Sequence, residues 1–520
     1  MRRKIFLLVT IFVLLTGLLI GCNKNTSEKE SKDDGSYRIA TVRWSDWGDE
    51  FLKGFVEKTE KEAGIKVKWD IYLNSEWPDK KSVLLAGGDL PDAFWGSLAL
   101  NDGDIAQNQD MFIPLEDLID KNMPNLKAAF EKEPLLRALV TSPDGHIYSL
   151  PKKLPLRPKT GNQLFINKKW LDNLGLSMPD TYEDFYNVLK AFKEKDANGN
   201  GDPNDEIPYG GGLANNVFSF ILPFGMTKGS DRAGYMALKN GEPVFLPTLD
   251  AYREGIEWMH KAYVEGLIDP EIFTQDQSMS DAKRKNEDVA LVGVAVGWTP
   301  DALFGPHADE YVPLPPLKGP DGNRYVISDA ETYGRNEFVI TKKCKDPDKL
   351  LQWVDKFYTE DASIQTFYGS FGVGVEKLDN GTYKVLEPPK GESADTFAWV
   401  HSFRDFGPKY IEDGFNDKVD LPKDSGDGLK LELDKQINQY AQEPYPYVIF
   451  TKDELQRLNT LSVDINSYVE SMQSKWVVEG GATKEWKSYI SQLKKMGLDE
   501  FMDIQKKAFD RYQNTLKELQ

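Results

Sequence analysis

Apolar and polar positions along the first hundred residues alternate in a pattern that predicts strands separated by helices. Residues 37–42 and 65–71 have the period-two alternation of strands, and 93–95 is a third, shorter apolar run. Residues 49–63 and 80–86 are spaced like helices between these strands. Strands that alternate with helices along the chain predict an α/β fold whose neighbouring strands run parallel.

The same pattern continues further along the chain. Thr181 opens a helix with a capping box, and 346–358 is a second helix. Residues 289–296 and 338–340 are apolar enough to be buried strands, and the chain ends in two amphipathic helices. A chain of 520 residues is too long for one hydrophobic core, so we expect two or more packed lobes.

The first 22 residues have the pattern of a secretory signal. Three cations precede a charge-free, mostly apolar run over 5–20, which is too short and wrongly flanked for a stable membrane-spanning helix. The run ends in Leu-Ile-Gly-Cys at 19–22, which resembles the lipobox of bacterial lipoproteins. That resemblance implies cleavage of the signal peptide 1–21 and acylation of Cys22. The alternative is an ordinary signal peptide with a chance cysteine.

The residues after Cys22 predict a flexible tether over 22–36. None of the side chains from 23 to 36 is apolar, so this stretch buries too little surface to offset the entropy of ordering it. We therefore expect the folded part to begin near Tyr37, with the lipid anchor holding it at the extracellular face of the cell membrane.

Charge and cysteine content exclude several classes of protein. The 83 acidic residues outnumber the 64 Lys and Arg, and a net charge of -19 argues against a nucleic-acid partner. Two cysteines provide no disulfide framework, and four histidines provide few ligands for a Cys/His metal site.

Three motifs in a fixed order carry a resemblance to a known family. They are Gly-Gly-Asp-Leu-Pro-Asp-Ala-Phe at 87–94, the apolar run ending at Trp298, and Tyr-Val-Pro-Leu-Pro-Pro at 311–316. Together they resemble the extracellular solute-binding proteins of ABC importers, in particular the large LplA-like lipoproteins that serve carbohydrate importers. The resemblance implies a two-lobe, periplasmic-binding-protein-like α/β fold with crossover hinges and a ligand cleft between the lobes. By that analogy the first lobe is 37–155 plus 328–375, and the second is 156–327 plus 376–520.

The family also implies what the protein does. It would be a monomeric receptor that captures an oligosaccharide by closing its lobes and delivers it to the permease and ATPase of an importer.

An oxygen-rich loop at 196–206 has the spacing of a calcium site. Side-chain oxygens stand at positions 1, 3 and 5, and Gly201 at position 6 allows the sharp turn that such a loop needs. Position 12 is Ile207 rather than Glu, and two acids stand just before it. This resembles the loop of alginate-binding and related oligosaccharide-binding proteins, where two adjacent acids close the cage, but here the acids stand about one residue later. Which of Asp202, Asn204, Asp205 and Glu206 binds is therefore open. The candidate Ca²⁺ ligands are Asp196, Asn198, Asn200, Asp202, Asp205 and Glu206. The alternative is a polar turn at a helix end.

Sugar sites combine aromatic faces with a few placed polar groups, which directs attention to the 12 tryptophans. Trp298 is the first candidate because it closes a strand where the resemblance implies a cleft tryptophan. Trp44 and Trp47 follow the carboxyl end of the first strand, where open α/β sheets bind ligands. The remaining candidates flank other elements: Asp92, Trp95, Trp399 and Arg404. Each tryptophan could instead be a partly buried core residue.

A basic stretch at 145–171 leaves the charge of the ligand open. It contains no acidic side chain before Asp172, and its cations are Lys152, Lys153, Arg157, Lys159, Lys168 and Lys169. These cations could favour an anionic ligand such as a uronate oligosaccharide, or they could form a solvated hinge surface.

The rival interpretations are a secreted glycoside hydrolase or lyase, and a binding protein for another solute such as a peptide. A pair of carboxylates for hydrolysis is always available among 83 acids. The sequence has no G-x-S-x-G, no H-E-x-x-H and no P-loop motif, and it has no repeats typical of an adhesive surface protein. We therefore predict a binding protein rather than an enzyme.

Overall fold

A computed structural model describes residues 34–210, 224–225, 234–326, 332–390, 392, 394–422 and 425–519. The predicted signal peptide, Cys22 and most of the predicted tether lie outside these residues. Within the described ranges, no helix has both the length and the apolar character needed to cross a bilayer.

The larger of the two main sheets contains the strands predicted near the N-terminus. Strand β1 is parallel to β2 and β3, whereas β11 is antiparallel to both β3 and β4. The six strands in spatial order are β14 (Lys409–Tyr410), β4 (Leu150–Lys153), β11 (Tyr333–Ile340), β3 (Ala93–Trp95), β1 (Tyr37–Arg43) and β2 (Val67–Leu73). Residues from three distant parts of the chain therefore build one sheet.

Helices cover this sheet and form its core. They are α2 (Phe55–Ala63), α3 (Trp77–Gly87), α4 (Asp102–Gln107), α5 (Glu116–Asn122), α6 (Pro124–Lys132), α7 (Pro134–Val140), α14 (Pro347–Val354) and α15 (Glu360–Tyr368). Ile39, Trp95 and Phe338 of the sheet are fully buried against Trp353 of α14 and their other apolar neighbours.

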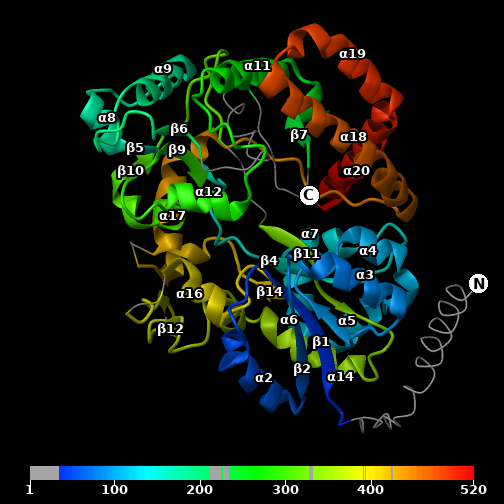
Figure 1. Cartoon of the computed structure of the whole chain (residues 1–520). Coiled ribbons are helices and arrows are strands. Elements are labelled where there is room, and N and C mark those ends of the chain that lie inside the picture. The colour runs from blue at the N-terminus through cyan, green and yellow to red at the C-terminus, as the bar shows by residue number, and fades with distance from the viewer. Residues whose placement is uncertain are drawn as a thin grey trace, which may run out of the picture.

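The second sheet has four strands and its own helical cover, and it lies in the other half of the molecule (Figure 1). Its order is β10 (Tyr311–Pro313), β5 (Gln163–Asn167), β9 (Val292–Gly297) and β6 (Ile207–Tyr209). Beside it are α8 (Lys168–Leu174), α9 (Tyr182–Glu194), α11 (Asp250–Val264), α12 (Gln277–Arg284), α13 (Pro300–Phe304) and the hairpin of β7 (Met236–Lys239) and β8 (Glu242–Phe245).

Three C-terminal helices extend the core of this second half. They are α18 (Lys452–Glu479), α19 (Ala482–Lys495) and α20 (Leu498–Leu519), and α18 packs along α11. Trp476 and Tyr489 are buried between these helices with Tyr252 of α11.

A small three-stranded sheet completes the described structure. It contains β12 (Val375–Lys377), β13 (Tyr383–Val385) and β15 (Val419–Asp420), with α16 (Ala394–His401) and α17 (Gly426–Ile437) nearby. Short 3-10 helices occur at Glu50–Leu52, Gln109–Met111, Leu246–Thr248, Gly305–Glu310, Asp355–Tyr358, Phe415–Lys418 and Asn438–Tyr440.

The predicted fold class, a two-lobe α/β architecture, is confirmed. The chain crosses between the two main sheets after β4 and again after β10, which agrees with the expected crossovers. Two local predictions need correction, and one long helix was missed. Gly54, at φ 69°, divides the predicted helix 49–63 into a 3-10 turn and α2. Antiparallel β11 makes the large sheet mixed rather than parallel, and the long helix α18 was not predicted.

Candidate ligand-binding site

Aromatic rings from two distant segments meet at the carboxyl end of β1. The rings of Trp47, in the loop after β1, and Trp399, on α16, lie 5.5 Å apart between centroids. Phe406 continues the surface, with its ring centroid 6.2 Å from that of Trp399 and 6.3 Å from that of Trp44. Trp44 is 50% exposed. Three of the predicted tryptophans are therefore brought together, and Phe406 joins them.

A buried arginine fixes the two segments to each other. Arg43, the last residue of β1, donates to the backbone carbonyls of Ser402, at 2.9 Å, and of Trp399. These carbonyls belong to the C-terminal end of α16, where unpaired oxygens and the helix dipole attract a cation. The guanidinium carbon also lies 5.4 Å from the centre of the Trp47 ring. Burial lowers the pKa of Arg43 to about 10.

Trp298, the first predicted ligand residue, lies between cations. It is half-buried in the turn after β9. The Arg157 guanidinium carbon and the Lys430 Nζ each lie 4.8 Å from the centre of its ring. Arg157 comes from the crossover between β4 and β5, and the fully buried Lys430 comes from α17. Such contacts are favourable because the ring face attracts positive charge.

Carboxylates connect these cations to the other rings. Arg157 forms ion pairs with Asp405, at 3.5 Å, and with Asp427, at 3.4 Å. Arg404 is 4% exposed and pairs with both carboxylate oxygens of Asp427. Burial alone would lower the pKa of Arg404, but Asp427 and Asp405 outweigh it and raise that pKa. Because Asp405 adjoins Phe406 in the chain, the ion pairs join Trp298 to the rings around Trp399. We call this set of rings and charges the aromatic cluster.

The cluster also contains a buried lysine that the sequence analysis missed. Lys409 of β14 donates to the carbonyls of Phe406, at 2.7 Å, and of Gly407, at 2.9 Å. Burial and the nearby charge of Lys152 lower the pKa of Lys409 to about 7. Two hydrogen bonds from one buried ammonium therefore hold the loop that carries Phe406.

Most cations of the basic stretch 145–171 have carboxylate partners. Besides Arg157, the pairs are Lys152 with Glu337, Lys153 with Glu133 and Asp413, Lys168 with Asp172, and Lys169 with Glu310. The positive charge seen in the sequence is thus largely balanced in three dimensions.

Two predicted ligand residues lie at strand β3 of the large sheet instead of in the aromatic cluster. Trp95 is fully buried, and its ring packs against Trp69 and Trp353. Asp92 precedes β3, at the end opposite to Trp95, and accepts a 2.7 Å hydrogen bond from the Arg38 backbone N–H. Both residues therefore stabilise the large sheet.

The predicted calcium loop connects α9 to β6. The Asp196 carboxylate accepts hydrogen bonds from the backbone N–H groups of Gly199, at 2.8 Å, and Gly201, at 2.9 Å. Both glycines have positive φ, 77° and 93°, as the tight turn requires. The amides of Asn198 and Asn200 donate to Asp205 at 2.9 and 2.6 Å. Asp202 accepts from the Asn204 backbone on the exposed side of the loop.

Glu206 provides the test of whether this loop fits a cation. Its side chain is 3% exposed, and one carboxylate oxygen accepts from the Ala197 N–H at 2.7 Å. The other oxygen is buried without a hydrogen-bond partner. In the described ranges, no group of three or more Asp, Glu, His or Cys side chains is arranged to hold a metal ion. The donors are nevertheless the hard oxygens that Ca²⁺ prefers, and an orphaned buried carboxylate oxygen is expected where a cation belongs.

Known proteins match this chain over most of its length. Residues 44–364 match the sequence profile of bacterial extracellular solute-binding proteins. The fructooligosaccharide ABC transporter substrate-binding protein FusA of Streptococcus pneumoniae serotype 4 is 32% identical over 481 residues, which cover 89% of this chain and 87% of FusA. The lipoprotein LipO of Bacillus subtilis is 27% identical over 71% of this chain and 73% of its own.

Solved structures give the same result. FusA of S. pneumoniae in complex with kestose superposes with a TM-score of 0.80 at 30% identity, covering 92% of this chain and all of FusA. A second FusA structure, an EF-hand mutant with fructo-nystose, superposes equally well at the same identity and coverage. An HMO-binding solute-binding protein from Bifidobacterium longum infantis has a TM-score of 0.80 at 28% identity, covering 92% of this chain and 99% of its own.

Proposed function

The chain belongs to the bacterial extracellular solute-binding proteins, and on that premise we propose that it captures a neutral, fructose-containing oligosaccharide at the aromatic cluster. It is a substrate-binding receptor of a carbohydrate ABC importer, not an enzyme. The choice of a fructo-oligosaccharide follows the ligands of FusA, the relative that matches this chain over 87% of its own length.

The observation that carries the proposal is the grouping of Trp44, Trp47, Trp298 and Trp399 with paired charges. Aromatic faces stack on the apolar patches of sugar rings, and carboxylates and guanidinium groups hydrogen-bond the hydroxyls. The ion pairs of Arg157 with Asp405 and Asp427 are long and partly exposed, so each of these groups can exchange its partner for a sugar hydroxyl. Buried Arg404 orients Asp427. Trp95 and Asp92 are left out of the proposed site.

A neutral ligand fits the charge balance better than an anionic one. A uronate carries a carboxylate, and burying that charge without a partner is costly. Its binding would therefore need a cation in the site that no carboxylate of the protein already compensates. Arg157, one of the two cations nearest Trp298, is already paired with the carboxylates of Asp405 and Asp427. The charge balance therefore disfavours an anionic ligand. Lys152 and Lys153 are buried in ion pairs, so the stretch 145–171 is not a fully solvated hinge surface either.

Binding would act through closure of the two lobes. We propose the lobe boundaries expected from the sequence, with 409–410 joining the first lobe because β14 belongs to the six-stranded sheet. Trp298 follows a strand of one sheet and Trp44 follows a strand of the other, so one ligand can contact both. A ligand that contacts both lobes favours the closed form, which then docks on the permease.

The loop 196–206 would hold Ca²⁺ as a structural ion. Asp196, Asp205 and Glu206 supply the carboxylates, and Asn198, Asn200 and Asp202 supply further oxygens. The ion would neutralise the buried Glu206 carboxylate and fix the junction of α9 with β6. We expect a chelator to lower the melting temperature of the native protein and to leave that of Glu206→Gln unchanged. An identical effect on both would contradict the assignment.

Cys22 would carry the lipid that holds the receptor at the extracellular face of the membrane, as a monomer. Labelling with a palmitate analogue tests the anchor. We expect label on the native chain and none on Cys22→Ser, which should be released from the cell. Label on both would refute the role of Cys22.

A ligand panel tests the proposed function. Residues 23–520 would be melted with kestose, fructo-nystose, uronate oligosaccharides and short peptides, and each mixture would be analysed for products. A ligand at a hundred times its dissociation constant stabilises the folded form by about 2.7 kcal/mol. We expect a shift with the fructo-oligosaccharides and no products. A shift only with uronates or peptides, or the release of fructose, would contradict the proposal.

A further inference from the structure

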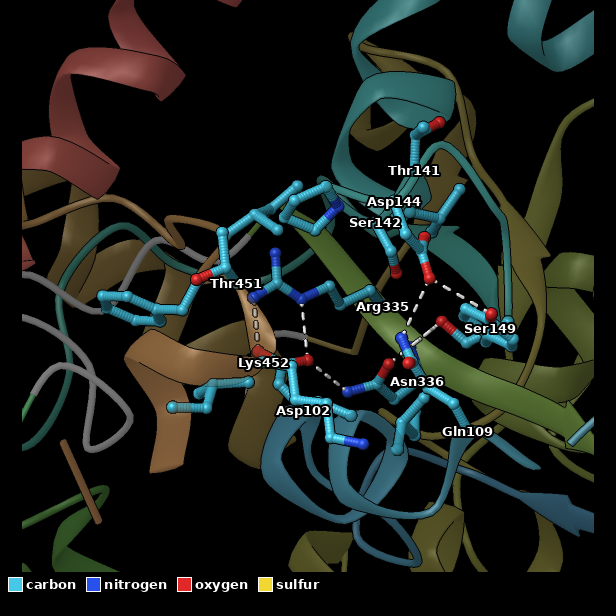
Figure 2. A pocket seen from close by; sticks show the side chains of 18 of the residues that line it. Asp102, Gln109, Thr141, Ser142, Asp144, Ser149, Arg335, Asn336, Thr451 and Lys452 are labelled. Carbon is cyan, nitrogen blue, oxygen red and sulfur yellow. Dashed lines mark hydrogen bonds and ion pairs between the residues drawn. The ribbon is translucent and has the colours of Figure 1, made fainter. Parts of the chain in front are cut away.

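A second cavity lies away from the aromatic cluster, between the large sheet and the start of α18. Its volume is about 290 Å³. Its walls come from α4, from the segment 139–149, from β11 and from residues 449–455. No residue of the aromatic cluster lines it. Segments that are more than 300 residues apart in the sequence therefore enclose one space (Figure 2).

The floor of the cavity is a buried polar network on an irregular part of β11. The pairing of β11 with β4 shifts register between Gly334 and Phe338, and Asn336 has the left-handed φ of 64°. Non-glycine residues rarely adopt this conformation, and the strain it costs is typical of functional sites. The irregularity turns both Arg335 and Asn336 toward Asp102 (Figure 2).

Every member of this network is held in place. Asn336 Nδ2 donates to Asp102 at 2.7 Å, and Asn336 Oδ1 accepts from the Ser149 hydroxyl at 2.9 Å. Arg335 pairs with Asp102 and donates to the Val448 carbonyl at 2.8 Å. The guanidinium charge is thus already balanced, and the network is a rigid, preformed surface that needs no reorganisation when a molecule binds.

The remaining walls alternate polar and apolar groups. Gln109 donates to Asp144 at 3.0 Å on one side, and Ser142 and Thr451 bring hydroxyls on others. Buried Ile105 and Leu139 supply apolar surface between them. At the rim a capping box closes the start of α18: the Thr451 hydroxyl accepts from the Glu454 N–H at 3.2 Å, and Glu454 accepts from the Thr451 N–H at 2.8 Å.

We propose that this cavity is a second binding site, which takes one small, neutral, hydroxyl-rich molecule such as a monosaccharide or a polyol. The size fits, since small-molecule pockets begin near about 300 Å³. The chemistry fits because hydroxyls both donate and accept, as the amides, hydroxyls and carboxylates of the walls require. The charged residues of the lining are Asp102, Asp144 and Asp453 against Arg335 and Lys452, so acidic groups outnumber cations and disfavour an anion. The charge of Arg335 is in addition balanced by Asp102.

Saturation-transfer NMR with D-fructose and with sorbitol tests the proposal, with melting curves as a check on folding. Ala106→Phe fills the cavity without removing any hydrogen bond, because Ala106 lines it with a methyl group alone. Gln107→Phe is the matched control, since the neighbouring residue on α4 is exposed and does not line the cavity. Trp298→Ala separates this site from the aromatic cluster.

We expect at least one probe to bind native protein, Gln107→Phe and Trp298→Ala, and to lose its signal with Ala106→Phe. If Ala106→Phe fails to fold, Gln109→Leu replaces it, and the loss of one hydrogen bond should weaken the probe about fivefold. The proposal is overturned if neither probe binds the native protein, or if binding survives the cavity variant and disappears with Trp298→Ala. Failure of fructo-oligosaccharides to bind would instead count against the aromatic cluster as the receptor site.

Discussion

Two groups of tryptophans in this molecule have opposite surroundings. In the core of the large sheet, Trp95 packs against Trp69 and Trp353 with ring centroids 5.6 and 5.7 Å apart. Trp95 and Trp353 are completely buried. In the aromatic cluster, Trp44 is half exposed and Trp298 faces two cations. The first group is closed to any ligand and the second is not.

The difference shows that neighbours rather than residue type decide what a tryptophan does. Removing a core ring leaves a void in close-packed surroundings, so the cost falls on folding. Removing a cluster ring leaves space that water can enter, so the cost falls on binding. Substitutions in the core should therefore lower stability, and substitutions in the cluster should lower affinity.

Trp353→Ala should have the largest effect, a loss of about 3–5 kcal/mol in the free energy of unfolding, as for other buried aromatic residues. Urea unfolding measures it. The fraction that remains folded should bind oligosaccharide with native affinity. A free energy of unfolding close to native would mean that the core tolerates the void. It would contradict the distinction between core and cluster tryptophans.

Trp298→Ala should cost about 2 kcal/mol or more of binding energy, which is about thirtyfold in affinity, with little change in stability. Calorimetric titration with kestose measures it. Trp486→Ala is the matched control, because Trp486 on α19 is also half-buried and also lies beside a cation, Arg253, at 5.7 Å. Equal losses of affinity in both variants would contradict the assignment of Trp298 as a ligand-binding residue.

Arg43→Met should weaken binding about tenfold, because two hydrogen bonds to the end of α16 are lost and Trp399 is no longer fixed beside Trp47. The near-ultraviolet circular dichroism of the ring pair should change with it. Arg38→Met, on the same strand but paired with Asp70 and Asp89, should keep native affinity. A native spectrum and affinity for Arg43→Met would contradict the positioning role.

Lys409→Met removes the two hydrogen bonds that hold the Phe406 loop, and the smallest effect expected here is the part of its stability change that depends on pH. The pKa of Lys409 is lowered to about 7, below its ordinary value of 10.5. Between these values the unfolded chain binds a proton that the folded chain does not, so native stability gains with rising pH. The Met variant lacks this gain. The free energy of unfolding of the native protein should therefore rise relative to that of the variant between pH 7 and pH 10. A pH-independent difference in unfolding free energy would contradict the lowered pKa.

The sequence predicted the strands, the fold class and the family because these depend on local periodicity and on motif order. It also predicted all four tryptophans of the aromatic cluster, because each of them follows a strand or stands near a cation in the sequence. They are Trp44, Trp47, Trp298 and Trp399. It could not separate them from Trp95, because burial is decided by partners such as Trp353, which lie more than 200 residues away. Lys409 and Asp427 carry no local signal at all, because their roles arise from the crossing of distant segments.

The most direct test is a calorimetric titration of residues 23–520 with kestose, followed by recovery of the sugar. A receptor that binds through the aromatic cluster predicts saturable binding of intact kestose, weakened by Trp298→Ala and unchanged by Trp486→Ala. Absence of binding, or recovery of free fructose in place of kestose, would contradict it.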